Sequence, residues 1–159
     1  MTTALHAERF TPLPADQAAT WRGFPGTDPV YFPGWVGIVL EDVRFDYARL
    51  RLPYRAQLDQ PAGVVHGGAI ATLIDTAVVP AIASGYAERR PLLTINMQIQ
   101  YMAPIIREDA IAEAWVEKRG RSTVFCRVEV RTAAGTLAAT GALAYKVGTR
   151  PVAFQSDGG

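Results

Sequence analysis

The chain of 159 residues contains one cysteine and two histidines. The single cysteine, Cys126, excludes a disulfide framework and any metal site built from several cysteines. His6 and His66 are too few for a histidine-rich metal centre, so we expect neither a metal nor a cofactor. Cys126 lies on the apolar face of an expected strand, and we expect it to pack in the core instead of acting as a nucleophile.

Charge is also scarce. Charged residues make up 19% of the chain, and 16 basic against 15 acidic residues leave a formal charge of +1. This balance provides no basic surface for nucleic acid or for an anionic membrane. Because 49% of the residues are apolar, we expect one domain with a large core. We also expect part of its surface to be buried against other copies of the chain.

The longest apolar run, residues 67–87, is not free of charge. It carries Asp75 near its middle, with Thr72, Thr76 and Pro80 beside it. These features favour a buried helix over a membrane span. The first residues lack the apolar stretch of a signal peptide, so we expect a cytoplasmic location.

Period-2 alternation of apolar residues predicts strands on both sides of this helix. Before it, one strand runs from Trp35 through Leu40 and a second reaches Tyr54, with a turn or bulge near Asp46 where the apolar register flips. After it, four strands are expected within residues 94–104, 110–117, 124–131 and 137–147, with a turn at 118–121. Short connections make the sheet antiparallel, and a helix that is apolar on most of its circumference must be enclosed. The sequence therefore predicts an α+β fold, a curved six-stranded antiparallel sheet around one long central helix.

The chain divides into three parts by composition. Residues 1–34 form a proline-rich, aromatic arm with a short helix expected between Pro14 and Arg22, and it is either a strap on the body or a lid over a site. Residues 35–147 form the main domain, and residues 148–159 are expected to be a loose tail.

Two features could carry chemistry. Asp75 is the only charge on the helix, and no Lys or Arg can reach it along that helix. The run Gly-Val-Val-His-Gly-Gly (63–68) leads into the helix start, where unpaired N–H groups and the dipole suit an oxyanion. Eight residues separate Gly67 from Asp75, about 12 Å at 1.5 Å per residue. If both act on one substrate, Asp75 must therefore come from a second copy of the chain.

Residues 60–77 (Gln-Pro-Ala-Gly-Val-Val-His-Gly-Gly-Ala-Ile-Ala-Thr-Leu-Ile-Asp-Thr-Ala) resemble the hotdog-fold thioesterases of the phenylacetate-degradation (PaaI) type. Residues 94–104 resemble the strand that follows in these enzymes, and the similarity covers roughly residues 35–147. The resemblance implies a homo-oligomeric acyl-CoA thioesterase, a dimer or a dimer of dimers, with acyl-CoA as its substrate.

The resemblance also implies roles for individual residues. The Gly67 amide would polarise the thioester carbonyl, with Gly68 allowing close approach, and His66 would hold the loop by hydrogen bonds. Asp75 of the partner subunit would attack the thioester or activate a water that Thr94 helps to position. Gln60 stands where many relatives have Asn, whereas one branch, the 4-hydroxybenzoyl-CoA thioesterases, has Gln there but Glu on the helix.

Coenzyme A carries phosphates, which require a local basic patch. Arg119 and Arg121 are the first candidates for this role, followed by Arg89 and Arg90. Two other functions remain open, namely a non-catalytic acyl-CoA binding or sensing protein and a hotdog dehydratase that pairs His66 with an acid. The sequence does not specify the acyl group.

Overall fold

The structure is a computed structural model that describes residues 6–26 and 31–150. Its long helix follows two strands and precedes four, as the sequence predicts. In chain order the elements are η1 (Ala7–Arg9), α1 (Ala15–Ala19), α2 (Phe32–Val36), β1 (Val39–Arg44), β2 (Tyr47–Leu52), η2 (Ala56–Leu58), α3 (Gly67–Ala83), β3 (Leu92–Tyr101), β4 (Ala110–Arg119), β5 (Thr123–Thr132) and β6 (Leu137–Val147).

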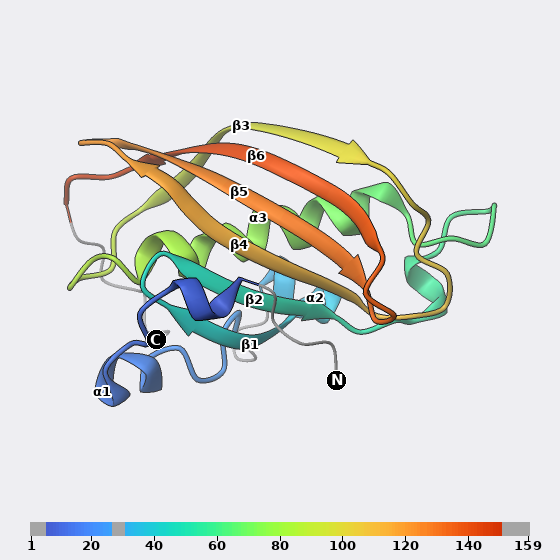
Figure 1. The fold of residues 1–159 in the computed structure, drawn as a ribbon, viewed down its shortest axis with the longest axis horizontal. Coiled ribbons are helices and arrows are strands. Elements are labelled where there is room, and N and C mark those ends of the chain that lie inside the picture. The colour runs from blue at the N-terminus through green and yellow to red at the C-terminus, as the bar shows by residue number, and fades with distance from the viewer. Residues whose placement is uncertain (1–5, 27–30, 151–159) are drawn as a thin grey trace, which may run out of the picture.

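The six strands form one antiparallel sheet in the order β1-β2-β4-β5-β6-β3. The sheet is curved, and α3 runs along one of its faces (Figure 1). Side chains that alternate along the strands, such as Leu50 and Val128, are fully buried against Leu73 and Ile74 of the helix. The predicted α+β hotdog fold is confirmed.

The closeness of α3 to the sheet depends on a glycine in β6. A Cβ atom on Gly141 would lie only 2.7 Å from Cγ2 of Ile74. No side chain larger than hydrogen fits between helix and strand at this point without a shift of one of them. The alternation of residues 137–147 placed this position on the inner face of the last strand, which the structure confirms.

The start of the first strand differs from the prediction. Residues that alternate from Trp35 were expected to be extended, but Phe32–Val36 form the short helix α2 and β1 begins only at Val39. Pro33 lies in the first turn of this helix, where its fixed φ favours helical backbone. Gly37 then ends the helix in the left-handed region at φ 92°. Proline and glycine therefore override the alternation, and α2 spans the expected boundary at residue 35.

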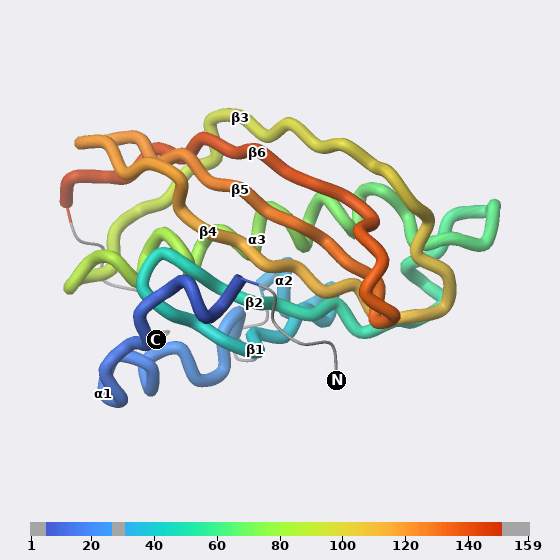
Figure 2. The backbone as a smooth tube through the Cα atoms, viewed as in Figure 1, coloured from blue at the N-terminus to red at the C-terminus, as the bar shows by residue number. Residues whose placement is uncertain are grey.

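Residues 6–12, here called the strap, pack on the face of the sheet opposite α3 (Figure 1). The ring of Phe10 stacks on Tyr47 of β2 with centroids 5.1 Å apart. The amide of His6 donates to Glu113 of β4, and its ring nitrogen lies 3.1 Å from the Glu129 carboxylate of β5. Pro12 also forms a β-bridge with Arg44 of β1, so the strap contacts β1, β2, β4 and β5. Figure 2 shows the strap in dark blue in front of the sheet, with α3 behind it.

The edge of the sheet opposite β1 is formed by β3, whose one strand partner among the described residues is β6. Two of its large apolar side chains are exposed, Leu93 to 64% and Ile95 to 58%. Among the described residues, no helix combines the length and the hydropathy needed to cross a bilayer. Most of the tail that was expected to be loose, residues 151–159, lies outside the described residues.

Candidate active site

The first candidate functional feature is the start of α3. His66 is the N-cap residue, and its Nδ1 accepts a 2.8 Å hydrogen bond from the amide of Gly68. In the part of the chain that the structure describes, the Gly67 N–H has no acceptor. One of the two glycine amides is therefore satisfied by the cap, and the other is available to a ligand at the positive end of the helix dipole.

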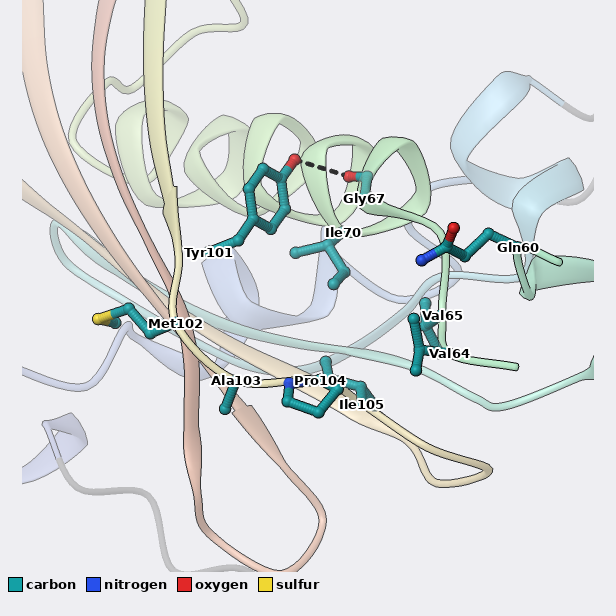
Figure 3. A pocket seen from close by; sticks show the side chains of 10 residues that line it. All are labelled: Gln60, Val64, Val65, Gly67, Ile70, Tyr101, Met102, Ala103, Pro104 and Ile105. Carbon is teal, nitrogen blue, oxygen red and sulfur yellow. Dashed lines mark hydrogen bonds between the residues drawn. The ribbon is translucent and has the colours of Figure 1, made fainter. Parts of the chain in front are cut away.

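A pocket of about 340 Å³ opens beside this amide. Most of its lining is apolar, and the polar groups are the Gln60 amide, the Tyr101 hydroxyl and the backbone of Gly67. Figure 3 shows that Tyr101 stands over the first turn of α3 while Gln60 lies across from it. The complete lining is Gln60, Val64, Val65, Gly67, Ile70, Tyr101, Met102, Ala103, Pro104 and Ile105.

Tyr101 is a pocket residue that the sequence reasoning treated only as part of a strand. Its hydroxyl donates a 2.8 Å hydrogen bond to the Gly67 carbonyl. Its ring lies 3.4 Å from the position a Cβ on Gly67 would take. Partial burial raises the pKa of this phenol above its ordinary value. Tyr101 therefore contacts the turn that carries the free amide and forms one wall beside it.

The second candidate functional feature is Asp75, two turns further along α3. Other segments supply donors to its carboxylate, which the helix itself could not provide. Thr94 Oγ1 of β3 donates to Oδ1 at 2.9 Å, and the Tyr145 hydroxyl of β6 donates to the same oxygen at 2.5 Å. The Tyr145 hydroxyl also lies 3.0 Å from the Asp75 carbonyl oxygen. Asp75 and Thr94 were predicted from the sequence as site residues, whereas Tyr145 was predicted only as part of a strand.

A β-bulge aims Thr94 at the helix. Thr94 is directly opposite Tyr145 in the β3–β6 ladder, and the register shifts between Thr94 and Asn96. Met97, three residues beyond Thr94, is paired with the inward-facing Leu143. Strict alternation would place Thr94 and Met97 on opposite faces, and the extra residue in the bulge puts both on the face toward α3.

The expected site residues thus fall into two groups on one protomer. Gln60, His66, Gly67 and Gly68 gather at the start of α3, and Asp75 and Thr94 lie together beyond its second turn. The rise of the helix separates Gly67 from Asp75 by about 12 Å. A single thioester cannot contact both groups within one protomer.

The structure does not bring the expected phosphate-binding arginines to the pocket. Arg119 bonds to Asp46 and donates to the Ile82 carbonyl at 3.0 Å, which places it at the far end of α3. Its guanidinium lies over the ring of Tyr86 at 4.6 Å, and Arg90 lies over the same ring at 4.7 Å. Arg121 is exposed in the turn between β4 and β5. Within residues 6–26 and 31–150, no cluster of His, Cys, Asp and Glu could hold a metal ion.

Comparison with known proteins shows the family to which the chain belongs. The model of the thioesterase superfamily matches residues 62–139, which include the start of α3, Asp75 and Thr94. A Halobacterium salinarum protein provisionally named an esterase is 36% identical over 107 residues, covering 64% of this chain and 70% of that protein. The chain belongs to the thioesterase superfamily.

Two further similarities place this thioesterase among known proteins. Human acyl-coenzyme A thioesterase 13 is 37% identical over 82 residues, which are 50% of this chain and 57% of the human protein. The Escherichia coli PaaI protein from the phenylacetic acid degradation operon superposes with a TM-score of 0.74 at 18% identity, covering 87% of this chain and 96% of that one. The latter similarity bears on the fold alone. The predicted enzyme class, a thioesterase, is confirmed.

Proposed function

We propose that this thioesterase hydrolyses acyl-CoA thioesters at a site formed by two protomers. The observation that carries the proposal is the free Gly67 amide beside an apolar pocket. The name of the human relative, an acyl-coenzyme A thioesterase, supports the substrate class. The apolar lining suits an acyl chain or ring, with the thioester held at the helix start.

The Gly67 N–H is the proposed electrophilic group. A thioester carbonyl oxygen that accepts from this amide gains negative charge as its carbon is attacked, and the helix dipole stabilises that charge. Gly68 has no side chain to obstruct the approach, and its own amide is already bonded to His66. Gln60 lines the same pocket, and its side-chain amide is the proposed second donor to the substrate.

Asp75 of the partner subunit is the proposed nucleophile or general base. As a base it removes a proton from water, the hydroxide attacks the carbonyl carbon, and the C–S bond breaks to release the CoA thiolate, which takes up a proton. As a nucleophile its carboxylate attacks first, and water then hydrolyses the mixed anhydride. Both routes consume one water and yield an acid and CoA.

A symmetric dimer through β3 would supply this second carboxylate. The strand is an unpaired sheet edge with exposed Leu93 and Ile95, a surface suited to pairing with another strand. Next to it, α3 leaves a stripe of Gly68, Thr72, Asp75 and Val79 only partly covered by its own sheet. Antiparallel packing of two such helices would bring the start of one near the middle of the other.

The dehydratase alternative requires His66 to act in proton transfer. Its Nδ1 accepts from the Gly68 amide, so the neutral ring carries its proton on Nε2 and has no free lone pair with which to act as a base. The geometry therefore favours hydrolysis over dehydration. A non-catalytic acyl-CoA binding protein would keep the same pocket, so turnover separates it from the enzyme.

The test is release of free thiol from a panel of aromatic and aliphatic acyl-CoAs, with Asp75→Asn beside the wild type. We expect turnover of at least one class and a loss of about 100-fold or more in the variant. Asp16→Asn, a change at an exposed position in α1, is the matched control and should retain full activity. Full activity in Asp75→Asn would contradict the proposed role, and tight binding without turnover would identify a binding protein.

A further inference from the structure

Tyr145 is a buried phenol directly beneath the proposed catalytic carboxylate. It lies on the inner face of β6, is 2% exposed, and donates to Asp75 Oδ1 at 2.5 Å. Burial, followed by the hydrogen bond with Asp75, raises the pKa of Tyr145 far above its ordinary value. The hydroxyl therefore stays protonated at any working pH and remains a donor.

The two oxygens of the Asp75 carboxylate differ in the number of hydrogen bonds they accept. Oδ1 accepts from both Tyr145 and Thr94. Among the described residues, no donor reaches Oδ2. A carboxylate whose one oxygen is fixed by two donors keeps a single rotamer, and its other oxygen is left for chemistry.

We propose that Tyr145 is a positioning residue, which anchors Oδ1 of Asp75 so that Oδ2 faces the substrate of the partner subunit. The inference rests on the proposed function, because it assigns work to the carboxylate proposed there. Of the two donors, Tyr145 is the buried one. Thr94 is exposed at the sheet edge, so its bond is the easier one for water to replace.

The first test is Tyr145→Phe, which removes the hydroxyl and keeps the ring. Loss of a hydrogen bond to a charged group should lower kcat by about 10- to 100-fold. KM should change by less than about threefold, since Tyr145 does not touch the pocket that binds substrate. An unchanged kcat in a folded variant would overturn the inference.

Tyr47→Phe is a matched control for the loss of a buried phenol. Tyr47 is also fully buried, and its hydroxyl donates to the Glu113 carboxylate at 2.7 Å on the outer face of the sheet. Both substitutions should lower the melting temperature, but only Tyr145→Phe should lower kcat. An equal loss of kcat in the two variants would show that Tyr145 acts through stability alone.

A double variant tests whether Tyr145 acts through Asp75. In the Asp75→Asn background, Tyr145→Phe should cause no further loss of activity, because the group it positions is gone. A full additional loss would assign Tyr145 some other role. If Asp75→Asn itself keeps wild-type activity, the proposed function has failed; if only Tyr145→Phe does, the inference alone has failed.

A spectroscopic measurement is independent of the folding of Tyr145→Phe. With tyrosine labelled by ¹³C at Cζ, removing the charge in Asp75→Asn should shift one resonance of the six tyrosines. The signal of Tyr47, identified by its loss in Tyr47→Phe, should not move. If no tyrosine signal responds to Asp75→Asn, the hydrogen bond does not exist in solution and the inference is wrong.

Discussion

The Nδ1 atom of His66 lies 2.8 Å from the amide nitrogen of Gly68, and this bond makes two adjacent glycine amides unequal. The Gly68 amide is satisfied by the cap, whereas the Gly67 amide has no acceptor among the described residues. The cap thus secures the helix start without consuming the Gly67 donor, to which we assign the proposed catalytic role. Both consequences come from one side chain, which explains why a histidine at this position need not act as a base.

The Gly67 amide can be removed by Gly67→Pro. Gly67 is the first residue of α3, where proline is well tolerated, and His66 before it has the extended backbone (φ −62°, ψ 135°) that proline requires. We expect kcat to fall by about 100- to 1,000-fold, the usual scale for loss of an oxyanion donor. Thiol release measures the effect. Gly67→Ala, which keeps the N–H, should lose much less, and equal losses in the two variants would argue for a steric cause.

Complementation tests whether the site spans two protomers. Gly67→Pro and Asp75→Asn should each be inactive alone, but a mixed dimer would contain one intact site. Random pairing makes about half of the dimers mixed, so co-expression should restore about a quarter of the wild-type activity. Purification of the mixed dimer through two different tags allows the measurement per site. If purified mixed dimers recover no activity, then Gly67 and Asp75 either act within one protomer or belong to separate sites.

The close contact between Gly141 and Ile74 predicts a strong effect on stability. Gly141→Ala would place a Cβ 2.7 Å from Ile74 Cγ2, and overpacking of this kind costs about 1–3 kcal/mol in the free energy of unfolding. Urea denaturation measures the loss. Ala142→Ser adds one atom to the other face of the same strand and should cost less than about 0.5 kcal/mol. Equal stabilities would show that α3 moves away from the sheet without cost.

Stability should fall at alkaline pH. Burial raises the pKa of the Cys126 thiol to about 12, against about 8.5 in an unfolded chain. The folded state holds this proton more tightly, so its contribution is complete below about pH 8.5 and is lost as the pH rises toward 12. Tyr47 and Tyr145, whose pKa values burial also raises, act in the same direction.

Urea denaturation between pH 7 and pH 11 checks this dependence, with Cys126→Ala as the control. In the variant, the free energy of unfolding should fall less steeply between these pH values than in the wild type. The fall that remains should come from the tyrosines. The same burial predicts that a thiol reagent at pH 8 labels Cys126 only after unfolding. Rapid labelling of the native protein would contradict the burial.

The main elements of the fold could be predicted because the apolar pattern is strong. Asp75 is the only charge on α3, and apolar residues alternate along most of the strands that follow the helix. The error at residues 35–40 has a local cause: Pro33 and Gly37 favour a helix and its end, and these backbone preferences outweigh a short alternation. Periodicity reports which face is buried, but it does not distinguish a short helix from a strand over five residues.

The arrangement of the candidate site could be predicted only in part. The helix start and Asp75 were visible in the sequence, and the helical rise alone showed that they are too far apart to act on one substrate within a protomer. The bulge after Thr94 has no clear sequence signal, since no glycine marks it. Tyr145 had the pattern of a core residue. The sequence did contain one signal for the contact between Tyr145 and Asp75. A buried tyrosine needs a partner for its hydroxyl, and Asp75 is the only carboxylate on the helix that Tyr145 faces.

The position of the strap has a consequence for the order of folding. His6 contacts Glu113 and Glu129, which follow it by more than 100 residues. During synthesis the strap therefore leaves the ribosome well before the strands that receive it. The bonds of His6 can therefore form only late, once β4 and β5 have been made, whereas Phe10 can stack on Tyr47 as soon as β2 is in place.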